Sequence, residues 1–221
     1  MAKVKFTDLF AVVLFVIPFL VWFLVKDKLP DNVTIHWGIN GEPNGWIGKG
    51  KLPFILLLIG GLGFGVYMML RFIKRIDPKR SAQMNEDLVI RIGTAVLTVN
   101  TLLCLVILIP GGIAYNVTSV VLVAVSLLFA FIGNVMYNIK PNYFVGIRLP
   151  WTLENADNWR QTHRLAGIIW FAGGLLSAAL ALVVAPASMF VIFIVITVLL
   201  VAIPTVYSFM RFRRMQTLTK Q

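Results

Sequence analysis

The sequence predicts an all-α membrane protein: a bundle of six transmembrane helices with both termini in the cytoplasm and a small extracytoplasmic hairpin-like loop. Of its 221 residues, 59% are hydrophobic and only 13% are charged, and the mean hydropathy is +0.87. A soluble domain cannot bury that much apolar surface. The apolar residues form six long runs with basic residues at their ends. We therefore expect residues 1–221 to form a single polytopic membrane domain.

Each apolar run is long enough to cross the bilayer as a helix of roughly 20 residues. Helix is the expected state because a spanning segment must satisfy its own backbone hydrogen bonds. Within the second run, Gly61 and Gly65 are spaced to let a neighbouring helix approach closely. The six predicted spans are residues 6–25, 53–72, 92–114, 118–137, 164–185 and 187–210.

The distribution of lysine and arginine predicts the orientation. With the N-terminus inside, the inner segments hold 16 of these residues and the outer segments hold 4. Cytoplasmic loops carry such an excess, so both termini are expected in the cytoplasm. The net charge of +11 also lies at the span ends, which indicates contact with anionic lipid. The lipid bilayer is thus an expected partner, and direct nucleic-acid binding is not expected.

The first outer loop, residues 26–52, has the pattern of a small hairpin. Residues 33–37 alternate in polarity like a short strand, and residues 40–41 and 43–45 are turn formers. Trp37 and Trp46 are suited to the headgroup level of the membrane. A plain aromatic loop without strands is the alternative.

The second inner loop, residues 138–164, is the longest polar and aromatic-rich interval in the C-terminal two-thirds of the chain. Residues 140–142 are expected to end the fourth span. Thr152 is a candidate N-cap for a following helix, which either runs along the membrane surface or continues into the fifth span. On that helix Trp159 and His163 share one face.

The sequence contains few residues suited to catalysis or metal binding. The two histidines, His36 and His163, fall on opposite sides of the membrane in this topology, and Cys104 is the single cysteine. No HExxH or GxSxG motif occurs. We therefore expect no catalytic residues, no metal site and no cofactor. Acidic residues are absent from the middle of every span, which weakens ion-coupled transport as an interpretation.

One stretch of the inner loop carries a family resemblance. The sequence K-P-N-Y-F-V-G-I-R-L-P-W-T-L-E-N-A-D-N-W-R-Q-T-H-R resembles the signature of the SdpI family of bacterial membrane immunity proteins. The outer loop resembles the domain of unknown function that precedes the signature in many members. The outer motif includes His36 and Trp37 and extends over Pro30, Gly41, Pro43 and Trp46.

The resemblance implies a multi-pass protein of the bacterial plasma membrane that protects against a membrane-active peptide toxin. In one member of the family, toxin binding also holds a transcriptional repressor at the membrane. Enzymatic activity is not expected, and an oligomeric state is not predicted. The residues of the inner signature are Asn134, Asn138, Lys140, Pro141, Asn142, Tyr143, Gly146, Arg148, Pro150, Trp151, Thr152, Trp159, Thr162, His163 and Arg164.

Three alternatives remain open from the sequence. The signature loop could form an enzyme site. A cavity joining its polar groups would support this alternative, and mutual pairing of those groups would count against it. A transporter of small molecules or lipids would need a continuous polar pathway between the helices. In a purely structural role, the polar groups would hydrogen-bond helix ends and the tryptophans would anchor the membrane interface.

Overall fold

The computed structural model describes residues 4–76, 78–81, 84–109 and 116–219. Six of its helices are long and apolar enough to cross a membrane, which confirms the predicted fold class. They are α1 (Phe6–Val25), α2 (Leu52–Arg71), α5 (Glu86–Ile107), α6 (Val117–Met136), α8 (Ala156–Val183) and α9 (Pro186–Thr219). The shorter elements are η1 (Lys49–Lys51), α3 (Ile73–Ile76), α4 (Pro78–Ser81) and α7 (Pro150–Leu153).

Helix bounds agree with the first, second and fourth predicted spans to within one residue. The third helix instead begins at Glu86 and ends at Ile107, and the predicted residues 110–114 lie outside the described residues. It starts early because the Asn85 side chain accepts a hydrogen bond from the Leu88 amide at 3.2 Å and so caps the helix. The sixth helix continues past residue 210 to Thr219.

Two predictions about the start of the fifth span are wrong. Helix α8 begins at Ala156 and runs unbroken to Val183, so the alternative of a separate surface helix is wrong. The predicted N-cap Thr152 is also wrong, because Thr152 lies inside α7. Asn155 caps α8 instead, since its side chain accepts a hydrogen bond from the Asn158 amide at 2.8 Å.

The outer loop forms the predicted hairpin, with β1 (Asn32–Trp37) antiparallel to β2 (Pro43–Gly48). The turn at residues 40–41 is confirmed, and Gly41 has a φ of +82°, which favours glycine. The second predicted turn, residues 43–45, is wrong because these residues open β2. A register shift beside His36 bends β1 at this point.

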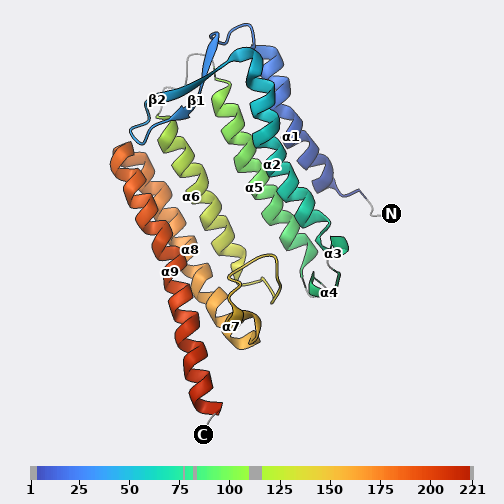
Figure 1. Ribbon diagram of the computed structural model, residues 1–221, viewed down its shortest axis with the longest axis vertical. Helices are drawn as coiled ribbons and strands as arrows, with labels where there is room; N and C mark the ends of the chain where they lie inside the picture. Colours follow the sequence, from blue (N-terminus) through green and yellow to red (C-terminus); the bar gives the residue numbers. More distant parts are fainter. Residues whose placement is uncertain (1–3, 77, 82–83, 110–115, 220–221) are drawn as a thin grey trace.

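The helices form two groups of three, α1, α2 and α5 in the first half and α6, α8 and α9 in the second (Figure 1). The closest pair is α6 with α8. A Cβ atom on Gly174 would lie 2.7 Å from the Ser126 carbonyl oxygen, so the backbones meet where side chains are smallest. The predicted close approach at Gly61 and Gly65 is wrong, because a Cβ atom on either would meet nothing within 4 Å.

We call the contact region between α5 and α6 the seam, because the two halves meet there. At the hairpin end the Asn116 side chain donates to the Asn40 carbonyl at 3.0 Å, and the Thr118 hydroxyl donates to the Gly38 carbonyl at 3.1 Å. At the opposite end one buried apolar cluster joins residues of both halves, among them Leu70, Ile73, Val89, Val135, Met136, Ile139 and Trp159. The halves are therefore tied together at both ends of the seam.

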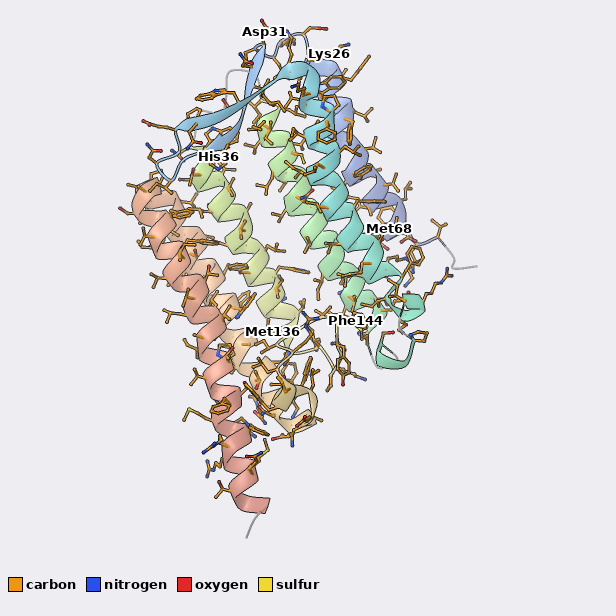
Figure 2. All side chains as sticks on the ribbon, in the orientation of Figure 1. Lys26, Asp31, His36, Met68, Met136 and Phe144 are labelled. Carbon is orange, nitrogen blue, oxygen red and sulfur yellow. The ribbon has the colours of Figure 1, made fainter. Side chains whose placement is uncertain are left out.

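The hairpin and the signature loop lie at opposite ends of the bundle. Figure 2 shows His36 at the hairpin end, and Met136 and Phe144 at the other end. The connection between α8 and α9 is at the hairpin end, while α3, α4 and α7 are at the signature end (Figure 1). The two predicted motifs thus occupy opposite faces, as the predicted topology requires.

Candidate functional site

The signature loop connects α6 to α8, and Asn142 organises its first part. This side chain is only 2% exposed. Its amide donates to the Lys140 carbonyl at 2.8 Å and to the Val145 carbonyl at 3.0 Å. Its oxygen accepts from the amides of Phe144 and Val145 at 2.7 and 2.8 Å. Four hydrogen bonds therefore use the full capacity of this buried amide, and they fold the loop back on itself.

His163 holds the second part of the loop from its position on α8. Its Nε2 accepts a hydrogen bond from the Ile147 amide at 3.0 Å, and its Nδ1 donates to the Trp159 carbonyl at 2.9 Å. The ring must be neutral, because a nitrogen that accepts a hydrogen bond carries no proton. It stacks on the Trp159 ring with 4.0 Å between centroids, which confirms the predicted shared face.

Gly146 allows the chain to pass over these stacked rings. Its φ is +113°, a region that side-chain-bearing residues rarely adopt. An added Cβ atom would also collide with His163 Nε2 and lie 3.2 Å from the Trp159 ring. Both the torsion angle and the space therefore require glycine here.

Two further buried signature residues bond to the loop backbone. The indole of Trp159 donates to the Ile139 carbonyl at 2.7 Å. The Thr152 hydroxyl accepts from the Leu149 amide at 3.0 Å and lies 2.8 Å from the Ile147 carbonyl. The loop is thus closed by contacts within itself and with the start of α8.

A second set of contacts fastens the loop to α9. The Trp151 indole donates to Ser208 Oγ at 2.9 Å, and the Asn158 amide donates to the Ser208 carbonyl at 3.0 Å. Asn158 Oδ1 accepts from the Thr162 hydroxyl at 3.1 Å, and both residues are fully buried. Asp157 accepts from Arg211 at 2.6 Å.

Asn158 and Ser208 were not among the site residues predicted from the sequence. Asn158 shares a helix face with Thr162, which lies one turn further along the chain and was selected. That spacing could have identified Asn158. Ser208 lies in a different apolar run, and no local pattern connects it to the loop.

Other signature residues lie on the surface. Arg148 is exposed, and its guanidinium donates to the Tyr143 carbonyl at 2.8 Å. Tyr143 is 50% exposed. Asn138 lies beyond the end of α6 rather than on it, and Pro141 is half-buried. The further exposed members of the signature are Asn134, Lys140, Pro150 and Arg164.

In the first half of the chain, a buried ion pair lies at the same end of the bundle as the signature loop. Asp8 accepts hydrogen bonds from Arg71 Nε at 2.6 Å, from Arg71 Nη2 at 3.1 Å and from the Tyr67 hydroxyl at 2.8 Å. The Arg71 side chain is only 6% exposed. Such a fully bonded pair holds α1 against α2. The chain offers no nearby histidine, and no cluster of metal-ligating side chains occurs among the residues that the structure describes.

A cavity of about 870 Å³ lies beneath the hairpin, and we call it the outer cavity. Its upper wall includes His36 and Trp37, and the His36 Nδ1 is hydrogen-bonded to Asn44 Oδ1. Its lower wall comes from both sides of the seam and is mostly apolar: Leu103, Val106, Ile107, Val117, Val121, Leu122, Ala187 and Phe190. This is the size and composition of a site for an apolar ligand.

Only part of the outer motif faces this cavity. His36 and Trp37 line it, whereas Gly41 forms the hairpin turn beside it. The other motif residues, Pro30, Pro43 and Trp46, are exposed and do not line it.

Comparisons with known proteins match both parts of the chain. Residues 138–208 match the SdpI/YfhL protein family, and residues 13–61 match the Domain of unknown function (DUF1648). The chain is 23% identical to Immunity protein SdpI of Bacillus subtilis (strain 168) over 209 residues, which is 94% of this chain and 97% of that protein. No solved structure matches the chain. Together with the six membrane-length helices, this likeness identifies a multi-pass protein of the bacterial plasma membrane.

Proposed function

We propose that this chain is a membrane immunity protein that binds an apolar, membrane-active peptide toxin in the outer cavity, since residues 138–208 match the SdpI/YfhL protein family and the chain is similar to an immunity protein. The single observation that carries the proposal is the position of this cavity. It lies directly under the hairpin, on the face where a secreted toxin would arrive in the predicted orientation.

The lining of the cavity suits a peptide segment rather than a small polar metabolite. The walls below the hairpin are mostly apolar side chains of α5, α6 and α9. Polar groups are concentrated at the hairpin side, where His36, Asn40 and Asn44 could bond to a peptide backbone. An apolar pocket with a few polar groups binds ligands chiefly by burying apolar surface, and the polar groups fix their orientation.

The signature loop supports a receptor more than an enzyme. The enzyme alternative required a cavity joining Asn142, His163 and their neighbours. Instead, both side chains form hydrogen bonds with backbone groups of the loop. The transport alternative required a polar path between the helices, whereas the helix residues that line the outer cavity, such as Leu103 and Val106, are mostly apolar.

Docking of a cytosolic repressor is a finer proposal that rests on the exposed part of the signature. Tyr143, Arg148 and Arg164 are all exposed, and the signature loop and the start of α8, which carry them, lie at the end opposite the hairpin (Figure 1). An aromatic ring beside cationic groups is a common composition for a protein-binding surface. In this proposal the buried members of the signature hold the loop in shape and the exposed members contact the partner.

A substitution that fills the cavity tests the toxin proposal. Ala187 lines the cavity near the start of α9, whereas Ala185, two residues earlier, is exposed and does not line it. We expect Ala187→Trp to abolish protection of a sensitive host against the peptides secreted by the source bacterium, because the indole occupies the binding space. Ala185→Trp should protect as well as the native chain.

Growth inhibition is the measurement, with membrane content of each variant checked by immunoblot. Full protection by Ala187→Trp at equal membrane content would contradict binding in the outer cavity. Failure of the native chain to protect against any fraction of the secreted peptides would contradict the immunity function itself.

A further inference from the structure

A second cavity, of about 660 Å³, lies at the other end of the seam. Its walls are the residues before and within the first turns of α5 and the start of the signature loop. We call it the inner cleft. It is lined by Met84, Asn85, Asp87, Leu88, Arg91, Asn138 and Lys140. The toxin proposal assigns it no role.

The inner cleft carries a net positive charge. Arg91 and Lys140 are both exposed, and within the described residues neither side chain lies within 4 Å of a carboxylate. The one acidic wall residue, Asp87, is already paired with Lys5 at 3.0 Å. Two cations without ion-pair partners therefore face a space that is large enough for a ligand.

The remaining walls combine hydrogen-bonding and apolar groups. Asn85 uses its side-chain oxygen to cap α5, so its amide hydrogens stay available as donors. Asn138 adds a second exposed amide. Met84 and Leu88 supply an apolar portion beside these polar groups. Such a combination suits a ligand with an anionic head and a hydrocarbon tail.

The cleft also lies at the level where the apolar parts of the helices end. The uncharged run of α5 begins at Ile92, directly after Arg91, and α6 ends at Met136, two residues before Asn138. Phosphate groups of lipids lie at this level, and basic pockets between transmembrane helices can bind their headgroups.

We propose that the inner cleft binds the phosphate group of an anionic phospholipid, with Arg91 and Lys140 as the cationic ligands and Asn85 and Asn138 as further donors. Free phosphate has the same anionic oxygens. The lipid is favoured because Met84 and Leu88 give the cleft an apolar side, which a free anion would not use. Bound lipid would bridge α5 and the signature loop across the seam.

The test uses the full chain, purified in an uncharged detergent, and native mass spectrometry. Dioctanoyl phosphatidylglycerol is the anionic probe, and dioctanoyl phosphatidylcholine and inorganic phosphate are separate arms. We expect the double variant Arg91→Gln/Lys140→Gln to weaken phosphatidylglycerol binding by roughly tenfold or more, because two charge-assisted contacts are lost. The control Arg213→Gln/Arg214→Gln removes the same charge from exposed positions on α9 outside the cleft and should bind as the native chain does.

Three outcomes would overturn the proposal. They are undiminished binding by the double variant, equal binding of phosphatidylcholine, and binding of inorganic phosphate with the same affinity and the same dependence on Arg91 and Lys140. Size-exclusion chromatography checks that each variant is folded. If the double variant is misfolded, Lys140→Gln alone decides, because this exposed residue lies outside the helices. Unchanged affinity in that variant would equally reject the site.

Discussion

Gly146 shows how a single residue fixes the shape of the signature loop. Its positive φ turns the chain, and its missing side chain admits the His163 ring that bonds to Ile147. The buried polar residues Asn142 and His163 then depend on that path for their partners. A buried polar group without its partner is costly, so these residues stabilise one conformation of the loop.

We therefore expect Gly146→Ala to destabilise the purified protein by about 2 kcal/mol, because a strained torsion and a steric clash act together. Thermal unfolding followed by tryptophan fluorescence measures the effect. Gly61→Ala is the matched control, since a Cβ atom there meets nothing within 4 Å and alanine favours helix. Equal stability of Gly146→Ala and the native chain would contradict the proposed role of Gly146.

At the scale of single residues, the sequence predicts a polar and aromatic loop but not which of its residues are buried. The signature contains Asn142, Trp159 and His163, which are buried, together with Arg148 and Arg164, which are exposed. Burial of these residues depends on how the loop folds over α8, which no local period reveals. The contact of Trp151 and Asn158 with Ser208 is also invisible locally, because it joins two separate apolar runs.

At the scale of elements, the hairpin is held by α6 rather than by its own strands alone. The Asn116 side chain reaches the Asn40 carbonyl in the turn, and a Cβ atom on Gly41 would collide with Asn116. Two-stranded hairpins are marginally stable by themselves in water. We call the contact between Asn116 and the hairpin turn the latch. It therefore positions the hairpin, which forms the roof of the outer cavity.

Asn116→Ala should loosen this end of the hairpin. We expect the turn amides of Gly38 and Gly41 to exchange hydrogen roughly fivefold faster, as the loss of about one hydrogen bond predicts. Hydrogen–deuterium exchange of the purified protein measures the rate. Asn32→Ala, at the far end of β1 and exposed, should leave the turn amides unchanged. Similar rates in the native and Asn116→Ala proteins would argue against the latch.

Spans were predicted more accurately than their ends. Apolar length locates a helix because the bilayer requires about 20 apolar residues, and α1, α2 and α6 agree with this estimate. The first turn of a helix is not detected by apolar length when that turn is polar. Helices α5 and α8 therefore begin at Glu86 and Ala156, six and eight residues before their predicted starts at residues 92 and 164. Their caps Asn85 and Asn155 were the available signals.

For the whole molecule, the proposed function depends on the predicted orientation in the membrane. Toxin recognition requires the hairpin to face outward and the signature loop to face the cytoplasm. The excess of lysine and arginine at the signature end supports this arrangement. We also retain the proposal that residues 1–221 form one domain, since the latch and the inner apolar cluster each join the two halves.

Cysteine labelling tests the orientation. In a Cys104→Ala background we expect Trp46→Cys to react with an impermeant maleimide on intact cells, and Tyr143→Cys to react only after lysis. Both positions are at least half exposed, and Cys104 is buried. Labelling of both variants on intact cells would mean that the hairpin and the signature loop share a compartment, and the receptor proposal would fail.

The division into halves also has an evolutionary consequence. The two matched regions, residues 13–61 and 138–208, each fall entirely within one half. Apolar hairpin residues such as Val33 pack against α2 and α5 within their own half, while the signature loop keeps its own internal partners. On the proposed function, selection by a changing toxin can therefore alter the hairpin while the signature loop keeps its contacts.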